Sequence, residues 1–262
     1  HKAIRRQRQM CIRDRPDEAM YDKDSYHLQN VEYIYMTKAN RNQIKQKLME
    51  YGAAECSMYA PETSSDKQMY GNTGKSNFTA YYCDDTSKTT NHSVLIVGWD
   101  DNYSASNFNP QCRPSSDGAW LIRNSWGNCN SMGGYFWISY EDAMLQAEKN
   151  EEAEVAFFDV EKADNYDNNY QYDGGIPFAY SRSFLRGANV FEAKADEKMQ
   201  AVSFYTQEAN VNYEVSIYES PDSDNPMSGK LVSSLSGTIA ERGYHTLSLI
   251  HISEPTRRTP IS

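Results

Sequence analysis

One segment of the chain repeats apolar residues with a helical period. In residues 41–51, Ile44 and Leu48 lie four positions apart and therefore on one face of a helix. Asn40, a residue type favoured at helix N-caps, comes before the segment, and Gly52, a common stop signal, follows it. The pattern predicts a helix over residues 41–51.

Short apolar runs bounded by turn residues are typical of strands, and here they form two groups. The first group comprises residues 53–59, 93–99, 119–123 and 135–140. The second comprises residues 188–191, 199–206, 213–219, 230–236 and 244–247. A segment rich in Asp, Asn and Tyr, residues 157–175, lies between the two groups and is interpreted as a linker that becomes a strand edge. We therefore predict an α+β fold, with a sheet-rich first part followed by an all-β sandwich.

Composition narrows the class of protein. A hydrophobic fraction of 39% with 24% charged residues is typical of a soluble globular protein. No run approaches the roughly 18 apolar residues that a membrane span needs. The net charge of −10 argues against a nucleic-acid partner, because phosphate binding requires clustered Lys and Arg.

The charge is unevenly distributed, and both ends look foreign. Residues 247–257 resemble the translation of a transposase sequencing adapter, and residues 10–14 resemble the same adapter read from its opposite strand. We expect residues 1–15 and 247–262 to be non-native. These ends carry +5 and +1, which leaves −16 on residues 16–246.

Two apolar strands end in residues that can carry chemistry. His92 stands at the start of the segment 91–99. Asn124 directly follows the apolar residues of the segment 120–127, which ends Asn-Ser-Trp-Gly. With the glycines that precede the strand at 135–140, these segments resemble the second half of a papain-like cysteine peptidase. The resemblance covers roughly residues 27–145 and implies the barrel-like half of that fold.

The resemblance implies a role for each motif residue. His92 would pair with a Cys thiolate, whose pKa falls to about 3–4 in papain itself, and would protonate the leaving amine. Asn124 would orient the imidazole, and Trp126 would shield the His–Asn hydrogen bond from water. Ser57 and Ser93 match substrate-selecting positions, and their small size implies a roomy pocket.

Each of these residues also has a structural interpretation. A single His beside an apolar strand is more often a surface or core residue than a catalyst. Asn-Ser-Trp-Gly can be a turn with a packed indole, and Ser57 and Ser93 can be plain packing. The order and spacing of the motifs together favour the peptidase interpretation.

The nucleophile departs from the family pattern. The catalytic Cys of papain-like enzymes lies about 130–150 residues before the His, whereas 91 residues precede His92. We therefore expect the Cys upstream of residue 1 and no activity from this chain alone. Cys11 lies in the adapter-like end. The four other cysteines form disulfides, such as Cys112 with Cys129, or remain free buried thiols, and the sequence leaves both open; they are Cys56, Cys83, Cys112 and Cys129.

The last part of the chain resembles a lectin-like β-sandwich. Residues 170–175, 188–191 and 201–205 carry this resemblance, and such modules follow papain-like domains in surface and secreted proteins of gut-type Gram-positive bacteria. The predicted domains are residues 16–155, peptidase-like, and 156–246, lectin-like. The resemblance implies a glycan partner, although no residue demonstrates a sugar site.

Taken together, the sequence predicts a fragment of a papain-like cysteine endopeptidase, secreted or surface-attached, that acts on peptides or proteins. The alternative is a non-catalytic surface adhesin that binds glycans on the same scaffold. We expect no cofactor and no metal site. We further expect His92 and Asn124 within hydrogen-bond reach, and an exposed apolar patch around Val94, Ile96 and Trp126 that makes the chain marginally soluble.

Overall fold

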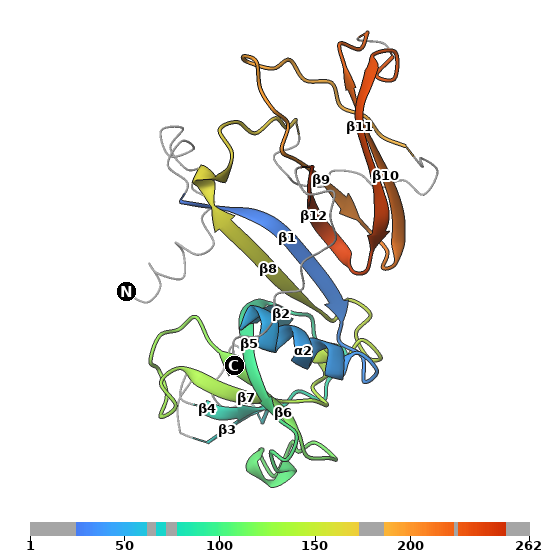
Figure 1. Ribbon diagram of the computed structural model, residues 1–262. Helices are drawn as coiled ribbons and strands as arrows, with labels where there is room; N and C mark the ends of the chain where they lie inside the picture. The colour runs from blue at the N-terminus through green and yellow to red at the C-terminus, as the bar shows by residue number, and fades with distance from the viewer. Residues whose placement is uncertain (1–24, 62–66, 72–77, 173–185, 223–224, 250–262) are drawn as a thin grey trace.

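The structure is a computed structural model that describes residues 25–61, 67–71, 78–172, 186–222 and 225–249 (Figure 1). In these ranges the first part contains β1 (Tyr26–Tyr35), α2 (Arg41–Tyr51), β2 (Ala54–Met58), β3 (Met69–Gly71), β4 (Phe78–Tyr81), β5 (His92–Asp100), η2 (Ala105–Asn107), β6 (Ala119–Arg123), β7 (Tyr135–Ser139) and η3 (Ala143–Leu145). The second part contains β8 (Glu154–Lys162), η4 (Ala163–Asn165), β9 (Ala201–Thr206), β10 (Val211–Glu219), β11 (Lys230–Ile239) and β12 (Arg242–Ser248). The predicted α+β, sheet-rich fold class is confirmed.

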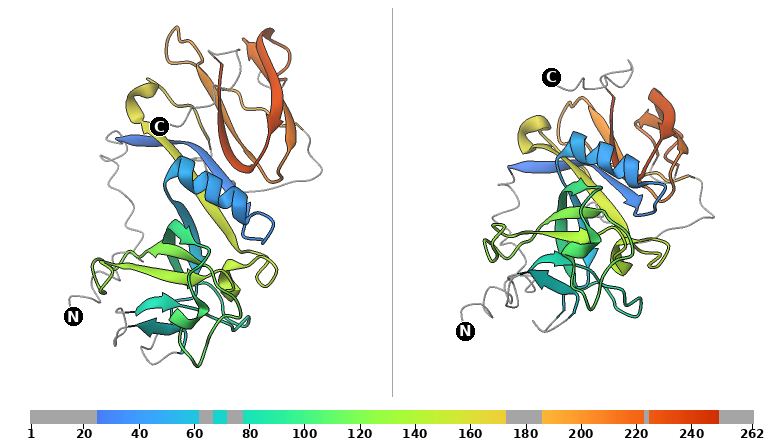
Figure 2. Two further views of the ribbon diagram at one scale, coloured as in Figure 1. Left: turned by 60° about the horizontal axis from the view of Figure 1, so that its bottom comes forward. Right: turned by 90° about the horizontal axis from the view of Figure 1, so that it is seen from below.

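One mixed sheet of ten strands runs through most of the molecule. Its order is β3-β4-β7-β6-β5-β2-β8-β1-β12-β9, and among these pairs only β4–β7 is parallel. The long β1–β8 pair lies between the strands of the first part and those of the second (Figures 1 and 2). The sheet thus joins the two parts by backbone hydrogen bonds rather than by a flexible tether.

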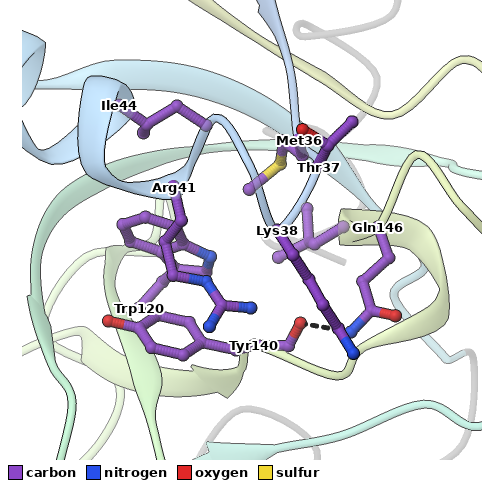
Figure 3. A pocket seen from close by; sticks show the side chains of 9 residues that line it. Met36, Thr37, Lys38, Arg41, Ile44, Trp120, Tyr140 and Gln146 are labelled. Atoms are coloured by element: carbon purple, nitrogen blue, oxygen red, sulfur yellow. Dashed lines mark hydrogen bonds between the residues drawn. The ribbon is translucent and has the colours of Figure 1, made fainter.

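The predicted helix is present at the predicted bounds. Ile44 and Leu48 are buried, and Gly52 ends the helix with a φ of 84°, its N–H donating to the Leu48 carbonyl at 2.8 Å. Arg41 lies over the Tyr140 ring at 4.1 Å, and this ring meets Trp120 edge-on (Figure 3). These contacts fix the start of α2 against the sheet.

The cavity beside the Arg41–Tyr140 stack is small, at about 10 Å³ (Figure 3). That volume is enough for about one water molecule and is far below the about 300–1,000 Å³ of small-molecule sites. No helix within the described ranges is long and apolar enough to cross a membrane.

Helix α2 covers the core of the first part. Val94 is 3% exposed and Ile96 0%, and both belong to a cluster that includes Ile44 and Leu48 of α2. The predicted exposure of Val94 and Ile96 is therefore wrong, because the helix covers the sheet face on which they lie. Between them on β5, Leu95 is 41% exposed.

A buried carboxyl ties the β4 end to η3. Asp142 is fully buried and accepts hydrogen bonds from the backbone N–H groups of Cys83 at 2.8 Å and Met144 at 3.0 Å. Burial raises the pKa of Asp142 to about 7, although the N–H donors act in the opposite direction.

The second part consists of two β layers. β9 and β12 end the large sheet, and β10 and β11 form a separate two-stranded sheet. Phe204 on β9 meets Tyr213 on β10 at 5.7 Å between ring centroids, so aromatic contacts join the layers. Four of the five predicted strands are present. The strand predicted at 188–191 is wrong: these residues are irregular, and Phe191 stacks on Tyr172 instead.

Four strands were not predicted: the short β3 and β4, and the long β1 and β8. β1 pairs with β8 from Tyr26↔Lys162 to Tyr35↔Glu154, with a bulge between Leu28 and Asn30. The segment from Phe157 that reads as a linker therefore begins with six residues of a strand. The predicted domain boundary after residue 155 falls inside β8.

Candidate functional site

His92 is the first residue of β5, held in place by its neighbour. Asn91 accepts a hydrogen bond from the Ala60 N–H at 2.7 Å and donates to the Ala60 carbonyl at 3.0 Å. The Asn91 N–H also donates to the Met58 carbonyl at 3.0 Å. These bonds fasten the start of β5 to the end of β2, so the backbone that carries the half-buried imidazole of His92 is held in place.

Asn124 follows β6 directly and meets the imidazole. His92 Nε2 and Asn124 Oδ1 are 2.9 Å apart, and Asn124 is only 4% exposed. The Ser125 N–H donates to the same Oδ1 at 2.8 Å, which identifies this atom as an acceptor. His92 Nε2 therefore carries the proton of this hydrogen bond, which leaves Nδ1 as the unprotonated nitrogen of the neutral ring. The predicted hydrogen-bond reach of the pair is confirmed.

Trp126 covers this pair. Its ring stacks on the His92 ring with centroids 4.9 Å apart and planes 25° from parallel. Trp126 is half-buried and also packs against the main core. An indole in this position limits the access of water to the His–Asn hydrogen bond, which strengthens it.

The loop after Trp126 is organised by a residue that the sequence analysis missed. The Asn130 side chain accepts from the N–H groups of Met132 at 3.0 Å and Gly134 at 2.8 Å. It donates to the carbonyls of Phe78 at 2.9 Å and Tyr135 at 2.7 Å. One amide thus joins the loop to β4 and β7.

The Asn130 network reaches the site through Gly134. The Gly134 carbonyl accepts from the Asn124 N–H at 3.0 Å. Gly134 has a φ of +88°, and a Cβ there would lie 2.1 Å from the Gly127 carbonyl oxygen. The paired glycines at 133–134 were the available sequence signal of this tight turn.

Ser57 and Ser93 face each other across β2 and β5. Their Cα atoms are register partners, beside the Met58↔His92 pair. Directly opposite residues point to the same side of a sheet, and neighbours along a strand point to opposite sides. Ser93 is exposed and Ser57 half-buried, and by this alternation their side chains point to the other side of the sheet from those of His92 and Met58.

The described cysteines are free thiols, which answers the open question of disulfides for Cys56, Cys83, Cys112 and Cys129. Burial raises the pKa of Cys56 and Cys83, and it raises that of Cys112 to about 11. Higher pKa values disfavour the nucleophilic thiolate. In the described part of the chain, no hydrogen bond joins a cysteine to His92.

The same ranges contain no group of three His, Cys, Asp or Glu side chains placed to hold a metal ion. Independently of this, the His92–Asn124 pair can transfer a proton at His92 Nδ1, with Nε2–H held by Asn124 Oδ1.

Comparison with known families gives two matches. Residues 5–155 match the papain family of cysteine proteases, and residues 169–255 match the lectin-like domain family. A comparison with curated proteins gives no match.

Two solved structures of the same clostridial protein resemble the whole arrangement. The cysteine protease Cwp84 after propeptide cleavage is 30% identical with a TM-score of 0.64, over 88% of this chain and 53% of that one. The cysteine protease and lectin-like domains of Cwp84, a surface-layer-associated protein of Clostridium difficile, are 29% identical with a TM-score of 0.63, over 88% and 47%. The present chain thus spans about half the length of these proteins.

Proposed function

Because the chain belongs to the papain family of cysteine proteases, we propose that it provides the His and Asn of a Cys-His-Asn site that hydrolyses peptide bonds. The observation that carries this proposal is the 2.9 Å contact between His92 Nε2 and Asn124 Oδ1 under the Trp126 ring. A solely structural His would not need a buried amide to fix its tautomer.

In this mechanism His92 Nδ1 takes the proton of a Cys thiol, and the thiolate attacks the scissile carbonyl carbon. The imidazolium Nδ1–H then protonates the leaving amine nitrogen as the C–N bond breaks, which leaves a thioester. Water then gives one proton to Nδ1 and attacks the thioester carbonyl carbon. As the C–S bond breaks, the imidazolium returns that proton to the sulfur, and the acid product loses its remaining proton to solvent and leaves as the carboxylate. Asn124 accepts from Nε2–H throughout, so the ring keeps its orientation in both protonation states.

The nucleophile in this proposal is a Cys upstream of residue 1. Three of the four described thiols are disfavoured as thiolates by burial, as given above. Substrate side chains would contact Ser57 and Ser93, which adjoin Met58 and His92 in the chain and whose small volume suits a roomy subsite. The likeness to a surface-layer-associated protease supports a secreted or cell-surface protein that cleaves protein substrates.

The test is to add the upstream sequence, up to and including a Cys-Trp preceded closely by Gln, and to assay cleavage of a peptide substrate that proteases of broad specificity accept. We expect activity that thiol-directed inhibitors abolish. His92→Ala should reduce kcat by about 10²–10⁴, the range typical of acid–base catalysis. His27→Ala is the matched control, since His27, a residue of β1, stacks on Tyr166 and lies outside this site.

Activity that survives His92→Ala would overturn the proposal. An upstream sequence with Ser or Gly at the Cys position would instead favour the non-catalytic adhesin. The adhesin has the same fold but gives no reason for a fixed Nε2–H tautomer at His92.

A further inference from the structure

Strand β4 contributes no residue to the His–Asn pair, yet it is bonded to the segments on both sides of that pair. At its first residue, the Phe78 carbonyl accepts a hydrogen bond at 2.9 Å from the Asn130 side chain, which organises the loop after β6. At its last residue, the Tyr81 hydroxyl donates at 2.5 Å to the carbonyl of Tyr59, directly after β2. The second bond has no role in the site as described so far.

The Tyr81 side chain is fixed in one orientation. It is 0% exposed, its ring lies 6.1 Å from that of Phe78, and both rings belong to the main core. A buried hydroxyl without a partner is unfavourable, so this phenol is bound to the carbonyl that it meets. Burial raises the pKa of Tyr81 well above its usual range. The phenol therefore stays protonated, and stays a donor, wherever the protein is folded.

The segment that accepts this hydrogen bond leads to His92. The residue after Tyr59 is Ala60, whose N–H and carbonyl are both bonded to the Asn91 side chain, at 2.7 and 3.0 Å. Residues 59–60 are thus held by β4 on one side and by Asn91 on the other. Asn91 directly precedes His92, so a displacement of residues 59–60 moves the backbone that carries the imidazole.

A second contact to Tyr59 does not replace this bond. The Lys88 ammonium lies 5.2 Å from the centroid of the Tyr59 ring. That contact acts on the ring and leaves the carbonyl unbound, and Lys88 is itself 38% exposed, so water weakens the interaction. The Tyr81 hydroxyl is the buried donor to the Tyr59 backbone.

We propose that Tyr81 is a positioning residue for the hydrolysis reaction. Its hydroxyl fixes residues 59–60, these hold Asn91, and Asn91 places the His92 imidazole opposite Asn124. The catalytic consequence rests on the proposed function, whereas the placement of the ring can be measured without catalysis. Strand β4 is then the common support of both members of the pair, through Tyr81 for the His and through its other end for the Asn.

Tyr81→Phe removes one oxygen atom and keeps the ring, so it tests the hydroxyl alone. In the ¹⁵N–¹H correlation spectrum of the whole chain, the wild-type His92 ring should show the Nε2–H tautomer. In Tyr81→Phe we expect a mixture of tautomers, and exchange of Nε2–H with water that is about three- to tenfold faster, the effect of one lost hydrogen bond.

Tyr82→Phe is the matched control. Tyr82 is the next residue along the chain and is also buried, but its ring meets Phe108 edge-on in a separate cluster. This variant removes a tyrosine hydroxyl from the same part of the molecule and should leave the His92 ring unchanged. A change of the same size in both variants would overturn the proposal.

A double-mutant cycle separates positioning from a general loss of stability. Asn91→Ala cuts the connection between residues 59–60 and His92. In that background Tyr81→Phe should produce no further change in the exchange of the His92 ring, because the two variants break one path. Effects of the two variants that simply multiply would show that Tyr81 acts on the ring by another route, and would overturn the proposal.

The activity measurement uses the chain completed with the upstream Cys sequence. Tyr81→Phe should lower kcat by about three- to tenfold and leave KM unchanged, because the substrate contacts are intact. A His92 spectrum identical in wild type and Tyr81→Phe overturns the positioning role even when the completed chain is active. An inactive completed wild type overturns the proposed function instead, and the spectra still decide whether Tyr81 places the ring.

Discussion

The two parts of the sheet differ in how completely each buries its own residues. In the peptidase part, Ile96, Ile122 and Ile138 on three adjacent strands are each 0% exposed. In the lectin-like part, most of β11 is exposed, and Ile239 at 9% is the one buried hydrophobic residue of that strand. The peptidase part thus stabilises itself, whereas the lectin-like part depends on its pairing with β1. The following predictions test this difference.

The largest effect is expected from the peptidase core. Ile122→Ala should lower the free energy of unfolding by about 2–5 kcal/mol, because the fully buried side chain would be replaced by a cavity in the core. Leu235→Ala, at a half-buried position of the mostly exposed β11, should cost less than about 1 kcal/mol. Urea unfolding followed by tryptophan fluorescence measures the first, since all four tryptophans, at 99, 120, 126 and 137, lie in the peptidase part. Equal losses for the two variants would contradict the comparison.

The response to pH should differ in sign between the parts. Asp142 has a folded pKa of about 7 against 3.8 when unfolded, so the folded state binds more protons between these values. Stability of the peptidase part should therefore fall as pH rises from about 4 to 7, by on the order of 4 kcal/mol at most. Asp142→Asn should flatten this dependence, at a lower baseline, because one amide N–H then faces a backbone donor.

The lectin-like part should show the opposite trend. Burial lowers the pKa of His245 below its usual 6.5, so its unfolded state binds the proton more readily. Stability from this residue is present above pH 6.5 and is lost as pH falls. Hydrogen exchange of β9 and β12 amides at pH 5 and pH 8, compared with His245→Gln, measures it. Faster exchange at pH 8, after correction for intrinsic rates, is the result that would refute this assignment.

The junction between the parts should be sensitive to a single methyl group. Gly243 has a φ of +144°, and a Cβ there would lie 1.8 Å from the Val31 carbonyl oxygen. Gly243→Ala should separate β12 from β1 and cost about 2 kcal/mol, with the tryptophan signal of the peptidase part unchanged. Gly187→Ala, in the same part with open space around it, is the control. A simultaneous loss in both parts would show that they unfold as one unit.

A modest effect on stability is expected at the Asn130 loop. Asn130→Ala removes four hydrogen bonds of a partly exposed side chain, which should cost about 1–2 kcal/mol because water replaces several of them. The change should also mix the tautomers of His92, visible in the ¹⁵N–¹H correlation spectrum of its ring. Asn109→Ala is the control: Asn109 bonds to the N–H of Gln111 and the carbonyl of Met69, away from the site. A single Nε2–H tautomer in Asn130→Ala would contradict the role of this loop.

Sequence patterns located the residues of the candidate site better than they located the sheet. His92 and Asn124 stand at the ends of strongly apolar strands, so their meeting depends only on the pairing of neighbours β5 and β6. β1 and β8 were missed because Gln29, Asn30 and Asp159 interrupt their apolar pattern. The bulge at Leu28 and a polar edge allow these residues, and neither feature can be read from alternation alone.

Exposure was harder to predict because it depends on distant elements. Val94 and Ile96 were expected at the surface, but the packing of α2 against β5 buries them. Asn130 was missed because a polar loop gives no indication of how many bonds one side chain makes. The catalytic roles of His92, Asn124 and Trp126, the substrate contacts of Ser57 and Ser93, and the domain limits stay predictions.

The position of β1 has a consequence for synthesis on the ribosome. β1 is the first described strand to emerge, yet its two partners are β8 and β12, and β12 is the last. At about 5–20 residues per second, the roughly 200 residues between β1 and β12 take about 10–40 seconds to translate. During that time β1 has at least one unpaired edge, and unpaired edges invite association with other nascent chains. The strand that joins the two parts of the folded protein is thus the one whose edge stays unpaired longest during synthesis.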